Sequence, residues 1–206
     1  MEKIYETAYA KINLGLDVLG KRSDGYHEVR MVMQSVGLSD AVEIEEGEGL
    51  VVETDHSGLA GGPDNLAWKA AELLARCCGK IPNVHIRLNK KIFLAAGLAG
   101  GSSDAAAVMR GLSRLWQLDL TAPELEKLAA ELGSDIPFCI TGGTALAEGR
   151  GEILTELPEA PELLLVLAKP KLEVATGWVY GNFRQQKVNQ RPDIDGIIKA
   201  LEQSAT

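Results

Sequence analysis

The stretch AAGLAGGSSDAAAV, residues 95–108, places a glycine-rich loop directly before an alanine-rich helix. Gly97, Gly100 and Gly101 allow backbone turns that side chains would forbid. The start of a helix exposes backbone N–H groups without intrahelical partners, and the helix dipole adds partial positive charge there. A loop delivered onto a helix start in this way can hold an anion, and phosphate is the obvious candidate.

The loop matches neither common phosphate-binding pattern. No lysine precedes Ser102 and Ser103, so the pattern G-x-x-x-x-G-K-[ST] is absent, and G-x-G-x-x-G does not fit residues 97–103. Serine and aspartate are also ordinary capping residues at helix starts. The stretch alone therefore leaves phosphate binding and simple helix capping equally open.

Hydrophobic alternation and capping signals predict an α+β chain rather than strictly alternating βαβ units. The first helix is expected to bury a stripe that includes Cys77, with Cys78 also packed, and to end at Gly79. The last predicted helix has nothing after it to pack against. Strands are predicted at 11–19, 29–37, 41–46, 50–54, 83–90 and 162–170, a hairpin at 142–154, and helices at 63–79, 103–118, 121–133, 134–140 and 193–203.

Composition limits which classes of partner and which cellular compartment are expected for this chain. The formal net charge of −8 argues against a nucleic-acid partner, because phosphate neutralisation needs a basic surface. No apolar run approaches the roughly 18 residues of a membrane span, so no membrane partner is expected. The three cysteines match neither a disulfide framework nor a zinc site, and no targeting segment follows Met1, which together favour a cytoplasmic protein.

Three segments together carry a resemblance to a known family. AYAKINLGLDVLGKRSDGYHE (8–28), AAGLAGGSSDAAAV (95–108) and LGSDIPFCITGGTALAEGRGE (132–152) resemble the galactose, homoserine, mevalonate and phosphomevalonate kinase superfamily. Within it they resemble the 4-diphosphocytidyl-2-C-methyl-D-erythritol kinases, from Lys3 to about Leu201. One departure is Phe93, where members of that family usually carry proline.

The resemblance implies a two-domain small-molecule kinase of the α+β class. Residues 1–158 would form an N-terminal ribosomal-protein-like β/α domain with the phosphate loop and catalytic residues. Residues 159–206 would be the start of a C-terminal α/β domain. The third glycine-rich motif of the family has no match here, so the chain is expected to be truncated, and whether it is active alone is open.

The implied reaction transfers a phosphoryl group from ATP, with Mg²⁺ bridging its phosphates, to the 2-hydroxyl of 4-diphosphocytidyl-2-C-methyl-D-erythritol. This step belongs to the non-mevalonate route to isoprenoid precursors. By resemblance, Asp135 accepts the proton of the attacking hydroxyl and Lys11 lies beside it. A nearby cation and a helix start would both keep that carboxylate ionised. The sequence singles out no protein ligand for Mg²⁺.

The same resemblance assigns the ligand contacts. Tyr26 would stack on the cytosine and His27 would read its edge. Tyr180 would supply a second aromatic face, and Asn13 would bind the erythritol portion. Asn65 and Lys90 would lie around the adenosine end of ATP. The residues expected to cradle the ATP phosphates are Gly97, Leu98, Ala99, Gly100, Gly101, Ser102 and Ser103.

Three alternatives remain open at this level. The chain could be another kinase of the same superfamily, of the homoserine or mevalonate type, although the segment SDGYHE favours the cytidine substrate. It could be a non-catalytic nucleotide-binding fragment. RNA binding, suggested by the ribosomal-protein-like fold, is disfavoured by the net charge. The oligomeric state is not predicted.

Overall fold

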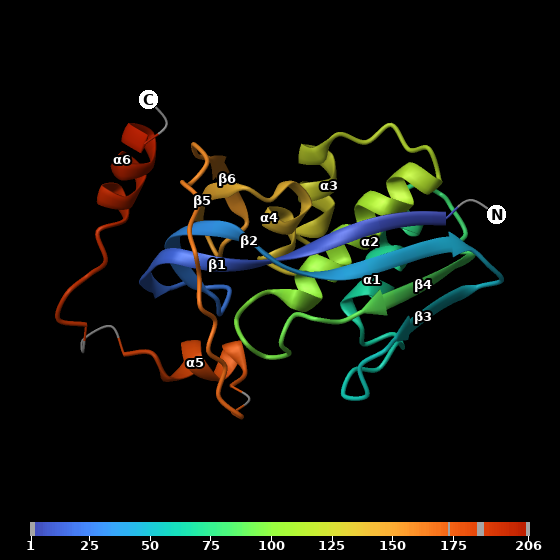
Figure 1. Ribbon diagram of the computed structural model, residues 1–206, viewed down its shortest axis with the longest axis horizontal. Coiled ribbons are helices and arrows are strands. Elements are labelled where there is room, and N and C mark those ends of the chain that lie inside the picture. Colours follow the sequence, from blue (N-terminus) through green and yellow to red (C-terminus); the bar gives the residue numbers. More distant parts are fainter. Residues whose placement is uncertain (1–2, 173, 185–187, 205–206) are drawn as a thin grey trace. The chain divides into compact units, whose positions relative to one another are not determined.

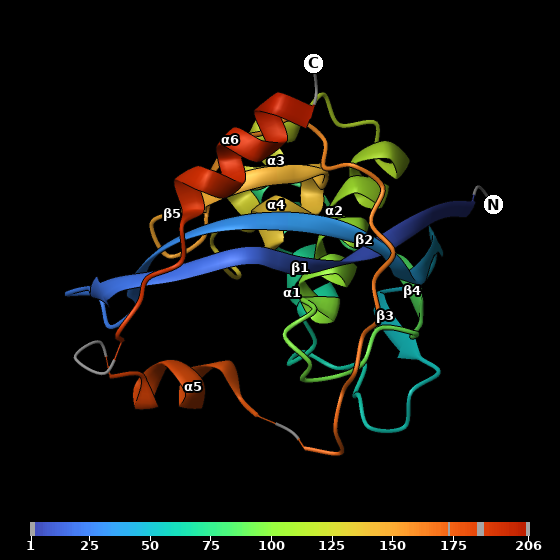
Figure 2. The same cartoon turned by 60° about the vertical axis from the view of Figure 1, so that its left-hand side comes forward.

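The computed structural model describes residues 3–172, 174–184 and 188–204 (Figure 1). Strands dominate the first quarter of the chain, and helices gather in its middle (Figures 1 and 2). The order is β1 (Lys3–Lys21), β2 (His27–Glu46), β3 (Leu50–Thr54), α1 (Leu66–Cys77), β4 (Val84–Asn89), α2 (Gly100–Leu115), α3 (Ala122–Ala129), α4 (Ile136–Thr141), β5 (Thr144–Glu148), β6 (Ile153–Glu156), α5 (Thr176–Asn182) and α6 (Ile194–Ser204).

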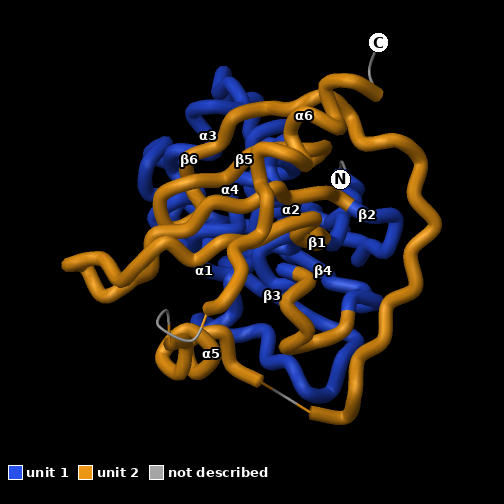
Figure 3. The backbone as a smooth tube through the Cα atoms, turned by 90° about the vertical axis from the view of Figure 1, so that its left-hand side faces the viewer, with its two compact units in different colours: residues 1–10, 36–92, 99–141 blue, residues 11–35, 93–98, 142–206 orange. Residues whose placement is uncertain are grey.

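The chain divides into two compact units that interleave along the sequence (Figure 3). Unit 1 comprises residues 1–10, 36–92 and 99–141, and unit 2 comprises residues 11–35, 93–98 and 142–206. Strands β1 and β2 each contribute one part to each unit. The domain boundary predicted between residues 158 and 159 falls inside unit 2, and that division into domains stays a prediction.

Unit 1 is a sheet backed by helices. Strand β4 pairs antiparallel with the second part of β2, from Ala41↔Asn89 to Glu46↔Val84, and parallel with β3. Alternate β4 residues are buried, which is the period expected of a strand with one covered face. Helices α1 and α2 pack on each other, and α2 and α3 pack on α4. The buried cluster draws on β2, β4, α1 and α2, including Ile44, Ile86, Leu74 and Met109.

Unit 2 has its own small core. The first part of β2 pairs antiparallel with β5, from Met31↔Ala147 to Gln34↔Thr144, and β5 pairs with β6 as the predicted hairpin. Helix α6 buries Ile194 and Leu201 in a cluster with Val32 and Leu146. The helix thus packs on elements that precede it in the chain.

Several boundaries differ from the sequence predictions. Segments 29–37 and 41–46 form the single strand β2, and α2 begins three residues earlier than the predicted residue 103. Cys77 is exposed, because the buried face of α1 is carried by its alanines and leucines. Helix α5 was missed. Among the described residues no helix has the length and hydropathy needed to cross a membrane.

Segment 162–170 is not the buried strand that its hydrophobic run predicts. It is irregular, and Leu164 and Val166 are 101% and 92% exposed. A strand is stabilised by hydrogen bonds to a neighbouring strand, and none of the strands in the described part of the chain pairs with this segment. Hydrophobicity alone could not supply that partner.

Gly61 gives a direct test of the packing around β3. A Cβ atom at Gly61 would lie 1.8 Å from the carbonyl oxygen of Val52, so backbone would have to move. We expect Gly61→Ala to lower the free energy of unfolding by about 1–3 kcal/mol, measured by chemical denaturation. Gly62→Ala is the matched control, since nothing lies within 4 Å of its Cβ position. Equal stability of the two variants would contradict this close approach.

Candidate active site

The start of α2, in unit 1, presents backbone donors as the sequence predicts. Ala99, the residue before the helix, has a left-handed backbone with φ 58°. The N–H of Ser103 donates to the Ala99 carbonyl at 2.8 Å, which is the first bond of the helix. The N–H groups of Gly100, Gly101 and Ser102 therefore lie ahead of the helical hydrogen-bond ladder, where an anion can bind them.

Ser103 is used by the fold itself. Its hydroxyl Oγ lies 2.7 Å from the carbonyl oxygen of Tyr9 and 3.0 Å from that of Ala99, and the residue is buried. The hydroxyl thus ties β1 to the first turn of α2. The predicted contact between Ser103 and phosphate stays a prediction, and the donors ahead of Ser103 are better placed for that task.

Asp135 lies at the start of α4, in the same unit. Its carbonyl accepts the N–H of Cys139 at 3.3 Å, so Asp135 directly precedes the first residue of this helix and accepts its first hydrogen bond. Cys139, one turn further on, places its Sγ 3.4 Å from Ser103 Oγ. The structure therefore brings the helix that begins at Asp135 against the first turn of the helix expected to hold phosphate.

Lys11 and Asn13 come together with the end of the glycine loop in unit 2. The Lys11 backbone N–H donates to the carbonyl of Leu98 at 3.1 Å, and its Nζ donates to Asn13 Oδ1 at 3.3 Å. Lys11 is only 6% exposed, whereas a lysine on a strand is usually solvated. Because Lys11 and Asp135 belong to different units, their predicted pairing stays a prediction.

The aromatic residues predicted to meet the cytosine lie within unit 2. The rings of His27 and Tyr180 have centroids 5.2 Å apart with an interplanar angle of 31°, and Phe183 meets His27 edge-on at 6.4 Å. The guanidinium carbon of Arg150 lies 5.0 Å from the ring centroid of Tyr26, a cation–π contact. Tyr180 is thus brought to His27, although it lies 153 positions away in the numbering.

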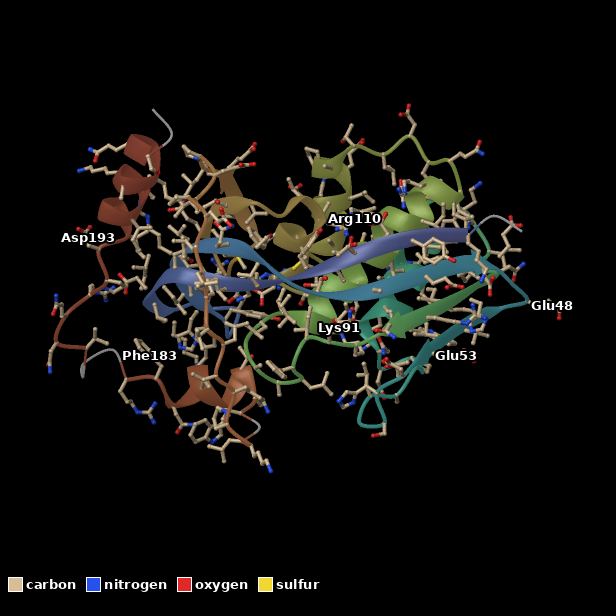
Figure 4. All side chains as sticks on the ribbon, viewed as in Figure 1. Glu48, Glu53, Lys91, Arg110, Phe183 and Asp193 are labelled. Carbon is tan, nitrogen blue, oxygen red and sulfur yellow. The ribbon has the colours of Figure 1, made fainter. Side chains whose placement is uncertain are left out.

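Phe183 and Arg150 were not identified from the sequence. Phe183 follows Tyr180 by three residues at the end of α5, and this helical spacing could have indicated it. It is labelled in Figure 4. Arg150 lies in the turn of the β5–β6 hairpin, and no sequence signal links that turn to Tyr26.

Lys90 lies in a buried ionic cluster of unit 1 that was also missed. Its ammonium contacts the carboxylates of Asp40 and Asp104, and the three side chains are at most 2% exposed. Asp40 also accepts the backbone N–H groups of Lys91 and Ile92, at 2.5 and 2.8 Å. The cluster therefore fixes the chain that enters the glycine loop and the helix that leaves it.

Burial raises the pKa of the Asp104 carboxyl from 3.8 to about 7. The neighbouring Lys90 opposes this rise, and the second carboxylate, Asp40, adds to it. Asp104 Oδ1 is buried, and none of the described residues offers it a hydrogen bond. A proton on this carboxyl relieves the excess negative charge of two carboxylates around one ammonium.

Two predicted nucleotide contacts have structural partners inside the protein. The Lys90 ammonium is enclosed by the carboxylates of Asp40 and Asp104. Asn65 caps α1 by accepting the Ala67 N–H at 2.9 Å, and its amide donates to the carbonyl of Ala60 at 2.8 Å. Asn65 is thus the N-cap of α1, and the contact of either residue with the adenosine end of ATP stays a prediction.

Comparison with known proteins identifies the family. The model of the GHMP kinases N terminal domain matches residues 65–143. The 4-diphosphocytidyl-2-C-methyl-D-erythritol kinase of Acetivibrio thermocellus is 48% identical over 98% of this chain and 71% of its own length. The enzyme of that name from Geobacillus kaustophilus is 48% identical over 95% of this chain and 68% of its own. The chain belongs to the 4-diphosphocytidyl-2-C-methyl-D-erythritol kinase family.

Solved structures agree with this assignment. A crystal structure of 4-(cytidine 5'-diphospho)-2C-methyl-D-erythritol kinase matches with a TM-score of 0.76 and 34% identity, over 98% of this chain and 72% of that one. Homoserine kinase from Cytophaga hutchinsonii matches with a TM-score of 0.65 at 17% identity over 97% of this chain and 69% of that one, which shows the fold alone. The predicted family and α+β kinase fold are confirmed.

In this kinase-family chain, the raised pKa of Asp104 predicts a pH-dependent stability. The folded protein binds more protons than the unfolded chain between about pH 4 and 7, so this carboxyl lowers the free energy of unfolding as the pH rises through that window. In Asp104→Asn the decrease between about pH 5 and 8 should shrink by roughly 2–3 kcal/mol. Chemical denaturation at the two pH values measures it.

The exposed Asp119 offers a matched control for this prediction. Asp119→Asn makes the same chemical change on the surface and should leave the difference between the two pH values as in the wild type. A full wild-type pH dependence in Asp104→Asn would show that this carboxyl does not titrate in that window.

Proposed function

We propose that this chain forms the catalytic part of an enzyme that uses ATP to phosphorylate the 2-hydroxyl of 4-diphosphocytidyl-2-C-methyl-D-erythritol, in the non-mevalonate route to isoprenoid precursors. Family membership supports the reaction. The observation that carries the proposal is the arrangement within unit 1, where α4, begun by Asp135, packs against the first turn of α2 through Cys139 and Ser103. We place the reaction in the cytoplasm.

The ATP phosphates would bind the start of α2. The N–H groups of Gly100, Gly101 and Ser102 precede the helical ladder, and the helix behind them is 16 residues long. A Cβ atom at Gly100 would lie 3.0 Å from Ile92 Cγ2, so the first helical residue packs closely on the chain that enters the loop. A loop held from both sides can bind phosphate without first having to order itself.

Asp135 would act as the proton acceptor for the attacking hydroxyl. Phosphoryl transfer through a loose transition state depends mainly on alignment and on charge neutralisation, so a weak carboxylate base suffices when proton loss comes late. Lys11, buried in unit 2 near Leu98, would supply a positive charge. Orienting the hydroxyl and balancing the charge on the transferred group are the two tasks that phosphoryl transfer sets such residues.

Mg²⁺ is part of the proposal as a partner of ATP. Among the described residues, no group of three or more His, Cys, Asp or Glu side chains could hold a metal ion, and the carboxylate of Asp104 is committed to Lys90. The ion would be held by phosphate oxygens and water, with at most one or two protein carboxylates. When bound, the ion would neutralise phosphate charge.

The cytidine would be recognised in unit 2. Tyr26, His27 and Tyr180 provide two ring faces and an imidazole edge, with Phe183 against His27. Stacking of a base on an aromatic ring is worth roughly 1–3 kcal/mol. Arg150 holds the ring of Tyr26 from one side, and Asn13 lies beside Lys11 for the erythritol portion.

A coupled assay of ADP release tests the proposed function. The natural full-length protein should release ADP with the diphosphocytidyl substrate and much less with homoserine or mevalonate. The 206-residue chain is assayed beside it. Faster ADP release with mevalonate or homoserine than with the diphosphocytidyl substrate would contradict the proposed substrate.

Asp135→Asn should abolish turnover while leaving ATP affinity largely intact. The amide keeps the size of the side chain but cannot accept the hydroxyl proton, so we expect kcat to fall more than about tenfold. Steady-state kinetics and ATP titration measure the two effects. Asp119→Asn on the surface is the control, and an Asp135→Asn enzyme with more than about a tenth of the wild-type rate would rule out the base role.

His27→Ala should raise the KM for the cytidine substrate with a smaller effect on kcat. The change removes an edge that can hydrogen-bond the base and the ring that contacts Tyr180, so a loss of about 1–3 kcal/mol in binding is expected. Initial rates at varied substrate measure it. His56→Ala, at an exposed loop position, should not change the KM. An unchanged KM in His27→Ala would argue against this cytidine site.

A further inference from the structure

Arg110, on the third turn of α2, joins three elements of unit 1. Its Nη1 donates to the carbonyls of Cys139 and Ile140 at 2.6 and 3.2 Å, and its Nη2 donates to the carbonyl of Thr7 at 2.9 Å. Its Nε donates to Glu6 at 3.1 Å. Figure 4 labels this side chain. One guanidinium thus connects α2, the C-terminal end of α4 and strand β1.

The two α4 carbonyls belong to the end of a helix that has only six residues. The last four carbonyls of a helix have no intrahelical partner, so in a short helix most of the backbone acceptors need a partner from outside. The planar guanidinium can satisfy two of them and a strand carbonyl at once, in a fixed geometry. Arg110 therefore determines where the end of α4 lies against α2.

The other end of α4 is Asp135. A helix of six residues is nearly rigid over its length of about 9 Å, so an element that fixes its last turn also fixes its first. The same arginine holds β1 at Thr7, four residues before Lys11 in the chain. It lies two turns beyond the phosphate-binding start of α2, outside the reach of the phosphates.

Arg114, one turn further along α2, makes a contrasting set of contacts. Its Nη2 donates to the carbonyl of Tyr5 at 3.1 Å and pairs with Glu6 at 2.7 Å, so it connects α2 to β1. Its side chain is 58% exposed, against 26% for Arg110. The two arginines share the partner Glu6 and the strand, and they differ in the link to α4.

We propose that Arg110 is a positioning residue for phosphoryl transfer, which holds α4 so that Asp135 lies within reach of a hydroxyl aligned with the phosphates at the start of α2. This inference rests on the proposed function. Its energetic basis is the charge-assisted bonds to three backbone carbonyls, beside the partly buried ion pair with Glu6. A shift of about 1 Å in a catalytic group can cost about a hundredfold in rate.

Three variants of the natural full-length enzyme test this role. In Arg110→Met the hydrocarbon stem remains and the donors are lost, and kcat should fall at least about tenfold with the KM for ATP within about twofold. Arg110→Lys keeps the charge beside Glu6 but cannot reach all three carbonyls, so its kcat should lie between those of Arg110→Met and the wild type. Arg114→Met should keep kcat within about twofold of the wild type. Rates are measured at a temperature where thermal melts show every variant fully folded.

The outcomes separate this inference from the proposed function. A drop in kcat confined to the Arg110 variants, graded from methionine to lysine, supports the positioning role. Equal losses in Arg110→Met and Arg114→Met, or a loss confined to KM, would mean that the arginine only stabilises the fold and would overturn the inference. An active wild type with an unaffected Arg110→Met overturns it as well. A wild type without turnover of the diphosphocytidyl substrate overturns the proposed function, and the inference with it.

Discussion

The ammonium of Lys90, buried between the carboxylates of Asp40 and Asp104, is the interaction on which the start of α2 and the chain entering the glycine loop depend. Burying charges is costly, and a buried cluster is tolerated only when its members are paired and hydrogen-bonded. Asp40 meets this condition by accepting the backbone N–H groups of Lys91 and Ile92. The cluster therefore orders the backbone that enters the glycine loop. Through Asp40, Lys90 and Asp104, the cluster connects strand β2, the residue that follows β4 and the second turn of α2.

The polar groups around the start of α2 have separate tasks. Asn65 caps α1, and the Ser103 hydroxyl binds the carbonyls of Tyr9 and Ala99. Arg110 satisfies carbonyls at the end of α4. The backbone N–H groups of Gly100, Gly101 and Ser102 precede the helical hydrogen-bond ladder, and their binding of phosphate stays a prediction. A loop with few side chains can be ordered here because the surrounding side chains supply the hydrogen bonds that hold its neighbours in place.

The family and fold were accessible from the sequence because the motifs are local. Strand alternation and helix capping depend on residues a few positions apart. In the structure, Asn65 caps α1, and Glu124 accepts the N–H of Thr121 at the start of α3. Segment 162–170 failed for the opposite reason. Its hydrophobic run is as good as that of β4, but a strand also needs a partner, and pairing is a property of the whole chain.

By itself, the sequence determined the elements around the glycine loop and the residue types that can bind phosphate, because backbone conformation and capping are decided within one or two helical turns. The tertiary structure alone decided which polar side chains are used up internally. From the sequence, Lys90 is expected at the adenosine end of ATP and Ser103 on phosphate, and nothing is predicted for Arg110. The fold brings Asp40, Tyr9 and Cys139 to these three side chains from distant positions. Burial removes the water that would otherwise satisfy such groups, so the protein must supply their partners, and only the folded arrangement shows which residues do so.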